Sequence, residues 1–180
     1  MAAQVNRLME EAGRARRSGA LDEAYDLLTE AVAVARTRPG SPDLVRALKG
    51  LGQIERDRGR VESARQWYGE AVSVCRDSGD SRTLAHTIRH LADIHRETGR
   101  VDLAEPYYRE ALVLYRGHET ADPLELANAV RPLALLLEGD GRPKEARELW
   151  AEALSLYEAA DVSAGVDESA THLDALTPGP

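Results

Sequence analysis

The sequence predicts an all-α fold built from four stacked helical pairs, because one segment recurs four times along the chain. In each copy a glycine is followed five residues later by an alanine, and a second alanine stands seven residues further on. The glycines are Gly19, Gly59, Gly99 and Gly141, which stand 40, 40 and 42 residues apart. A fixed period in this range indicates a stacked repeat array. The two alanines and the large side chain between them follow spacings of four and three, so they share one face of a helix.

Each glycine occupies a point where a preceding helix must end and the chain must reverse. Such a point favours a residue that tolerates positive φ. The helix expected before each glycine carries two large apolar residues three apart and then a small one. These are Leu48, Leu51 and Gly52, then Ile88, Leu91 and Ala92, and then Val130, Leu133 and Ala134. In the first copy Leu8 and Ala12 fit the pattern, whereas Glu11 occupies an apolar position.

The eight helices expected from this register lie at about 3–18, 21–37, 42–58, 61–77, 82–98, 101–116, 123–138 and 143–160. Ser41 and Asp122 each precede a proline, a pattern that predicts an N-cap followed by proline in the first helical position. Pro132 lies well inside the helix that begins at Pro123, where it removes a backbone donor, so we expect a kink there. The alternative, in which this helix begins later, is disfavoured by the cap at Asp122.

A last amphipathic segment at 163–176 places Ala170, Leu173 and Leu176 on one stripe, and it is expected to cap the final repeat. The expected organisation is therefore a single domain over 1–176. Its repeats lie at about 3–38, 41–78, 81–117 and 122–160, and its frayed tail covers 177–180.

This pattern of turn glycine, alanine, large apolar residue and alanine resembles the tetratricopeptide repeat (TPR). The family period is about 34 residues, and the repeat here is longer. The proline that usually ends the second TPR helix is also absent. In both respects the chain is similar to the long-period repeats of kinesin light chains and of many bacterial TPR proteins, in which the Ala104-Glu105-Pro106 sequence recurs. The resemblance covers about residues 4–160 and implies a right-handed superhelix, an α-solenoid, while indicating little about a specific function.

The amino-acid composition argues against several functional classes of protein. The formal net charge of −8 argues against binding nucleic acid, because such binding depends on neutralising phosphates. A single cysteine, Cys75, excludes an internal disulfide and fits a reducing compartment. No signal-peptide core and no run long enough to span a membrane is present in the sequence. We therefore expect a cytoplasmic protein, and the excess of arginine over lysine together with abundant alanine is typical of a GC-rich bacterial genome.

The groups that could carry chemistry have simpler interpretations. His86, His90 and Asp93 share one helical face and could hold a divalent cation, but a single helix supplies them, so we expect no metal site. His95 is expected at a packing position and His118 in a link. Cys75 is expected to be a small buried residue. No phosphate-binding loop, nucleophile elbow or dinucleotide fingerprint occurs, so we expect neither an enzyme nor a cofactor.

In the resembled family the first helix of each repeat lines a concave groove. This register assigns to the groove Arg46, Lys49, Gln53, Arg56, His86, Arg89, Asp93, Arg96, Asn128, Arg131 and Leu135. Basic residues outnumber acidic ones in this set although the chain is acidic. The carboxylate clamp of chaperone-binding TPRs is absent, since Met9, Gly13, Gly50, His86 and His90 occupy the matching positions.

We therefore expect a non-enzymatic protein–protein interaction scaffold that binds an acidic segment of a protein or peptide partner in this groove. The alternative is a sensor of peptides or small molecules in a bacterial signalling system. We expect no nucleic-acid or membrane partner, and at most a weak homo-dimer through the terminal repeats.

Overall fold

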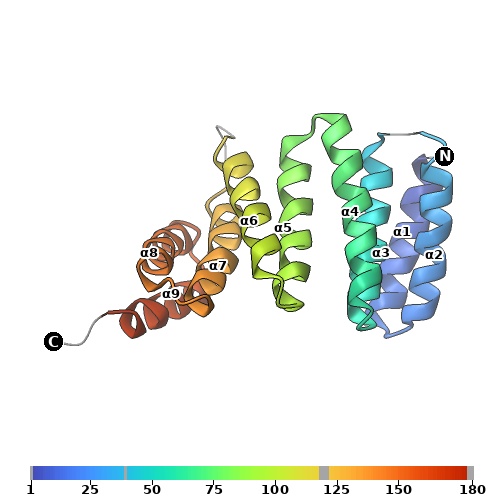
Figure 1. Cartoon of the computed structure of the whole chain (residues 1–180). Helices are drawn as coiled ribbons and strands as arrows, with labels where there is room; N and C mark the ends of the chain where they lie inside the picture. The colour runs from blue at the N-terminus through green and yellow to red at the C-terminus, as the bar shows by residue number, and fades with distance from the viewer. Residues whose placement is uncertain (1, 39, 118–121, 178–180) are drawn as a thin grey trace. The chain divides into compact units, whose positions relative to one another are not determined.

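A computed structural model describes residues 2–38, 40–117 and 122–177. These residues form nine α-helices and no strand (Figure 1). The helices are α1 (Ala2–Arg17), α2 (Leu21–Ala35), α3 (Pro42–Asp57), α4 (Val61–Ser78), α5 (Ser81–Glu97), α6 (Val101–Arg116), α7 (Pro123–Gly139), α8 (Pro143–Ala159) and α9 (Ser163–Ala175). Every expected helix is present, and its ends differ from the expected ones by at most two residues. The all-α fold is thus confirmed.

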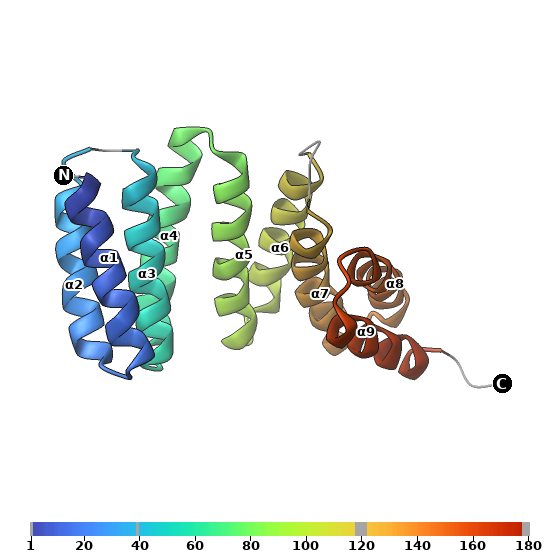
Figure 2. The same cartoon turned by 180° about the vertical axis from the view of Figure 1, so that it is seen from behind.

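The chain divides into two compact units, Met1–Ile94 and His95–Pro180, which we call the N-terminal and C-terminal units. The N-terminal unit holds α1 to α4 and most of α5, and the C-terminal unit holds α6 to α9. Consecutive helices from α1 to α4 and from α6 to α9 pack against one another as antiparallel neighbours, and side chains of α4 contact α5 (Figures 1 and 2). We call α1, α3, α5 and α7 the first helices and α2, α4, α6 and α8 the second helices. The expectation of a single domain stays a prediction.

The repeated alanines lie where helices approach most closely. All eight are fully buried at 0% exposure: Ala24, Ala31, Ala64, Ala71, Ala104, Ala111, Ala146 and Ala153. The large residue between each pair is also buried, and it is Leu28 in α2, Tyr68 in α4, Tyr108 in α6 and Trp150 in α8. A methyl group at the crossing lets two helix backbones approach while the large side chain fills the space beside it, so the register read from the repeats is confirmed.

The turn glycines all have positive φ, from 71° at Gly99 to 81° at Gly19. The same C-terminal hydrogen bond recurs at each turn. Arg60 N donates to Glu55 O at 2.7 Å, and Arg100 N donates to His95 O at 2.9 Å, each closing a six-residue motif around a left-handed glycine. An L side chain would be strained at this φ, which explains why glycine recurs at the period of the repeat.

The expected caps are also confirmed. Ser41 Oγ accepts a hydrogen bond from Leu44 N at 3.3 Å, and Asp122 Oδ1 accepts one from Leu124 N at 2.9 Å. Because α7 runs without a break from Pro123 through Pro132, the alternative of a later start is wrong. The kink at Pro132 stays a prediction. His118 and most of the link expected at 117–121, together with residues 178–180 of the expected tail, lie outside the described residues.

Within the described ranges, no helix combines the length and the apolar composition needed to cross a bilayer.

Candidate binding surface

Seven of the predicted groove residues lie in the N-terminal unit. We call them the first-helix surface, and they are Arg46, Lys49, Gln53 and Arg56 from α3 with His86, Arg89 and Asp93 from α5. Their side chains contact one another and the neighbouring α1. Arg46 Nη2 donates to Asn6 Oδ1 at 3.0 Å, and Lys49 Nζ lies 2.9 Å from His86 Nδ1. The structure therefore brings this part of the predicted site together.

Lys49 and His86 form the centre of the first-helix surface. Burial, with smaller effects from the charges of Lys49 and Arg89, lowers the pKa of His86 to about 4. The imidazole is therefore neutral at pH 7, and its Nδ1 lone pair can accept a hydrogen bond from the Lys49 ammonium. Burial also lowers the pKa of Lys49 from its usual range, and nearby Arg89 adds to this effect. No carboxylate among the described residues lies within ion-pair distance of the Lys49 ammonium.

The other two residues from α5 flank this centre. Arg89 Nη1 donates to Asp93 Oδ2 at 3.5 Å, and Arg89 Nη2 lies 3.3 Å from His90 Nε2. The His90 ring stacks on Tyr68 with centroids 5.5 Å apart, and it meets the His86 ring edge-on with centroids 4.6 Å apart. Burial, followed by the charge of Arg89, lowers the pKa of His90 to about 2. Both histidines are thus neutral at physiological pH.

Neither a metal site nor a reactive thiol is evident in this region. In the part of the chain that the structure describes, no three His, Cys, Asp or Glu side chains are placed to share an ion. Cys75 is 1% exposed, and its Sγ lies 3.8 Å from Thr87 Oγ1. Burial raises the pKa of this thiol, so it stays protonated at neutral pH. The expectation of a small buried residue at this position is confirmed.

The remaining predicted groove residues lie in the C-terminal unit, where other side chains already contact them. Arg96 Nε donates to Tyr108 OH at 3.3 Å, and the Tyr157 hydroxyl donates to Asn128 Oδ1 at 3.2 Å. Leu135 is half-buried.

Arg131 binds a carboxylate of the chain itself. Its Nε and Nη2 donate to the two oxygens of Glu168 in α9 at 2.7 and 2.6 Å, a bidentate pair. The hydrogen bond from Arg131 holds the pKa of Glu168 below its usual range. From its sequence α9 was expected only to cap the final repeat, so this contact was not predicted.

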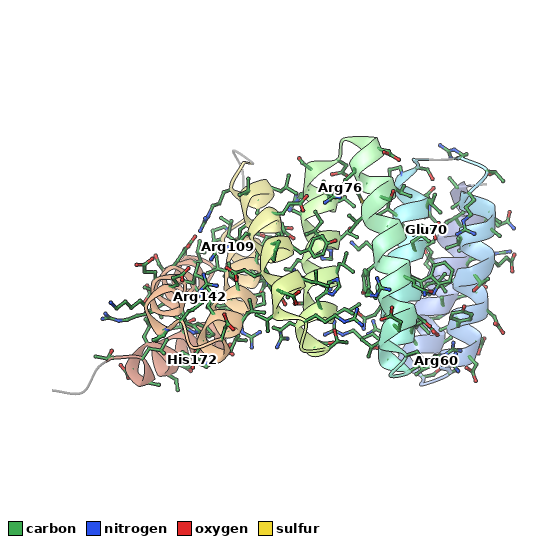
Figure 3. The ribbon with its side chains drawn as sticks, in the orientation of Figure 1. Arg60, Glu70, Arg76, Arg109, Arg142 and His172 are labelled. Carbon is green, nitrogen blue, oxygen red and sulfur yellow. The ribbon has the colours of Figure 1, made fainter. Side chains whose placement is uncertain are left out.

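Helix α9 occupies the register of a further first helix, and two recurring spacings show it. Tyr68 stacks on His90, 22 residues later, and Trp150 stacks on His172, also 22 residues later, with centroids 4.1 Å apart (His172 is labelled in Figure 3). Lys49 contacts the residue 37 positions later, His86, and Arg131 likewise contacts Glu168. Helix α9 therefore contacts α7 and α8 in the same way as α5 contacts α3 and α4. Aligning residues 163–175 with the earlier first helices would have predicted this.

The second helices are linked by ion pairs that the sequence analysis did not predict. Four partly exposed glutamates form these pairs, and they are Glu70, Glu105, Glu145 and Glu152. Each of them pairs with an arginine that lies in a neighbouring second helix or directly flanks one. The pairs are Arg36–Glu70 at 2.8 Å, Arg116–Glu152 at 2.7 Å, Arg109–Glu145 at 3.2 Å and Arg142–Glu105 at 2.7 Å (Glu70, Arg109 and Arg142 are labelled in Figure 3). The arginines are one third to one half exposed, so each pair contributes little stability but fixes the register between repeats.

These repeat contacts agree with a comparison of the sequence with known families. A sequence model of the MalT-like TPR region matches residues 9–174. The chain belongs to the MalT-like TPR family. No curated protein matches it.

Solved structures show the same fold in proteins of low sequence identity to this TPR chain. A crystal structure of a substituted form of a Podosopora anserina putative kinesin light chain with nearly identical TPR-like repeats has a TM-score of 0.78 and 18% identity, covering 96% of this chain and 84% of that one. Another structure of those repeats has a TM-score of 0.71 and 17% identity, covering 98% and 96%. BtubC (BKLC) from P. vanneervenii has a TM-score of 0.71 and 19% identity, covering 98% and 66%. These matches confirm the TPR solenoid, a fold that generally mediates protein–protein interaction and is typically non-enzymatic.

Proposed function

We propose that this TPR chain is a non-enzymatic interaction module whose first-helix surface binds a carboxylate on an acidic segment of a protein partner. The observation that carries the proposal is the state of Lys49. Its ammonium is substantially buried, it faces a neutral imidazole, and it has no carboxylate within ion-pair distance in the described residues. Asp80 raises the pKa of Lys49 only from beyond ion-pair distance. A desolvated cation without a carboxylate in direct contact is costly, and an arriving carboxylate would lower that cost.

The chain itself supports this choice of ligand, because Arg131 is the residue that corresponds to Lys49 two repeats later. At Arg131 the cation is satisfied by a carboxylate 37 residues further on, whereas at Lys49 the residue at the same distance is His86. At corresponding positions of two repeats, Arg131 thus has a carboxylate partner and Lys49 has none in the described part of the chain. A glutamate or aspartate from a partner would give Lys49 the contact that Glu168 gives Arg131.

The surroundings of Lys49 favour an anion but limit its affinity. Arg46, Arg56 and Arg89 bring further positive charge to the first-helix surface, and Asp93 is the one acid in the set. No tryptophan belongs to the surface, and its histidine rings pack mainly on one another and on Tyr68. We therefore expect modest affinity that falls with added salt, because partly exposed charges are screened.

The test uses two fluorescein-labelled synthetic peptides of equal length, one rich in glutamate and one with glutamine at the same positions. Fluorescence anisotropy measures their binding to the full chain, to Lys49→Met and to a control variant, Arg38→Met, whose side chain is exposed and lies outside the surface. The glutamate peptide should bind the parent and the control equally. Binding to Lys49→Met should be weaker by about ten-fold, the loss of one charge-assisted contact.

Folding does not confound this test, because replacing a desolvated ammonium by the apolar Met side chain should leave the melting temperature unchanged or raised. Equal binding of the glutamate and glutamine peptides, or unchanged binding to Lys49→Met, would refute the carboxylate site. Contributions from Arg96, Asn128, Arg131 and Leu135 are proposed as weaker, since these side chains already have partners or are apolar.

A further inference from the structure

A cleft of about 860 Å³ lies between the first half of α8 and the end of α9, within the C-terminal unit. The cleft is lined by apolar atoms of Pro143, Ala151, Leu173 and Leu176 and by the charged side chains of Lys144, Arg147, Glu148 and Asp174. Ala151 is exposed and both leucines are incompletely buried. None of the first-helix surface contributes to the cleft, so the two features are separate.

The cleft lies where the repeat pattern requires a second helix. In the described chain the first helices α3 and α7 are each packed against the second helix of their own repeat, α4 and α8. Helix α9 has the register of a first helix, but no described helix packs on it in this way. A second helix for α9 would lie beside α8, along the side of α9 that borders the cleft.

The edge of α8 that borders the cleft corresponds to the edge of α6 that α8 itself contacts. Three α6 positions form ion pairs across the α6–α8 boundary, and they are Glu105, Arg109 and Arg116. The corresponding α8 positions, 42 residues later, are Arg147, Ala151 and Glu158. The first two line the cleft. In the described residues neither Arg147 nor Glu158 has an ion pair or a side-chain hydrogen bond, whereas all three α6 side chains have one.

The charges on this edge of α8 are reversed relative to α6. Glu105 pairs with Arg142, so Arg147 in the corresponding position requires an acidic partner at the start of the incoming helix. Arg116 pairs with Glu152, so Glu158 requires a basic partner ten residues further along that helix.

Three of the four second helices, α4, α6 and α8, carry the opposite charges at those two positions. They are Arg60 with Glu70, Arg100 with Glu110, and Arg142 with Glu152. Any of these three, placed in the cleft, would put like charges against Arg147 and Glu158. Helix α2, with Ala20 and Glu30, would put an acid against Glu158 and no acid against Arg147. The occupant is therefore not a second helix of another copy of this chain.

We propose that the cleft between α8 and α9 docks an amphipathic helix of another protein, with an acidic residue in its first turn and a basic residue ten positions later. Small residues on its inner face would meet α9 as the paired alanines of the second helices meet their own first helices, and its charges would pair with Arg147 and Glu158.

The test uses two stapled helical peptides that share one inner face, copied from Ala146, Trp150 and Ala153 of α8. The acidic-first peptide carries glutamate in its first turn and lysine ten positions later, and the basic-first peptide carries arginine and glutamate at those positions. Anisotropy measures binding to the full chain. The acidic-first peptide should bind about ten-fold tighter, because two partly exposed ion pairs change from attraction to repulsion.

Three variants locate the binding. Ala151→Arg fills the cleft from an exposed position and should abolish binding, while Arg147→Glu should make the chain prefer the basic-first peptide. Arg38→Glu, a charge reversal of an exposed side chain in the N-terminal unit, should change neither affinity. All three side chains are exposed, and unchanged thermal melting would show that each variant folds.

The proposal is overturned by equal affinity for the two peptides, by no binding, or by binding that survives Ala151→Arg. Sedimentation of the chain alone supplies a further check. A dimer that Ala151→Arg dissociates would assign the cleft to a second copy and overturn the heterologous helix. Lys49→Met should leave the acidic-first peptide bound, which separates this site from the first-helix surface.

Discussion

Two glycines inside helices of the N-terminal unit should respond in opposite ways to the same substitution. Gly52 lies in α3 and Gly69 lies in α4. An added Cβ at Gly52 would lie 2.7 Å from both Cδ2 and Cε2 of Tyr68, whereas an added Cβ at Gly69 would meet nothing within 4 Å. The Tyr68 ring cannot easily withdraw, since it is 2% exposed and is stacked on His90. Gly52→Ala therefore creates overlap, and Gly69→Ala does not.

The magnitudes follow from two opposing effects. Replacing glycine by alanine inside a helix stabilises by about 0.5–1 kcal/mol, because the unfolded chain loses less conformational freedom on folding. Overpacking a closed core costs about 1–3 kcal/mol. Gly69→Ala should thus stabilise the unit by up to about 1 kcal/mol, while Gly52→Ala should destabilise it by up to about 2 kcal/mol. The helix-propensity effect is shared, so the difference between the variants isolates the cost of the contact with Tyr68.

Urea denaturation followed by circular dichroism measures both changes in the free energy of unfolding. A double variant of Gly52→Ala with Tyr68→Leu checks the mechanism, because removing the ring should make the effects of the two substitutions less than additive. If Gly52→Ala were as stabilising as Gly69→Ala, then α3 and α4 would not approach through Gly52, and the packing described here would be refuted.

Three further expectations concern the register, the histidines and metal. Ala104→Leu should overpack its crossing and cost about 1–3 kcal/mol, and an unchanged melting temperature would contradict the register. The free energy of unfolding should fall as pH drops from about 6.5 to about 4, because in this range the unfolded chain protonates a histidine that burial, with Lys49 and Arg89 nearby, keeps neutral at position 86 in the fold. Because the His86 side chain is partly exposed, the loss is on the order of 1–2 kcal/mol. Denaturation at a series of pH values measures it, and His86→Gln should make the free energy of unfolding less dependent on pH. Calorimetric titration with zinc should show no stoichiometric binding, and binding that His90→Ala abolishes would prove this wrong.

The sequence predicted the helices well because their determinants are local and periodic. Positive φ at Gly59 and Gly99, the cap at Ser41 and the buried alanine at Ala104 each depend on a few neighbouring residues. A recurrence of the same local pattern at a fixed period leaves little freedom in where each helix begins and ends.

The candidate site was predicted less completely, because its contacts depend on which long side chains meet across repeats. The pairing of Arg131 with Glu168 became visible only once α9 was seen to have the register of a first helix. Periodicity places Lys49 and Arg131 at corresponding positions, but it does not say that one faces imidazole and the other carboxylate. Similarly, the alignment of Glu105 with Arg142 depends on rotamers that a linear pattern does not specify.

The lengths of the helices and of the links between them determine which insertions and deletions such a protein can accept during evolution. Helices α5 and α7 both have 17 residues, and both begin 18 residues before their turn glycine, although their repeats differ in period by two residues. The two additional residues therefore lie between the start of α6 and the start of α7, because the link after α6 is four residues longer than the link after α4 and α6 itself is two residues shorter than α4. An insertion within a helix would rotate every later side chain by about 100° per residue and misalign each contact between repeats. Insertions and deletions should therefore survive in the links alone, whereas duplication of a whole repeat would regenerate each contact at the new junction.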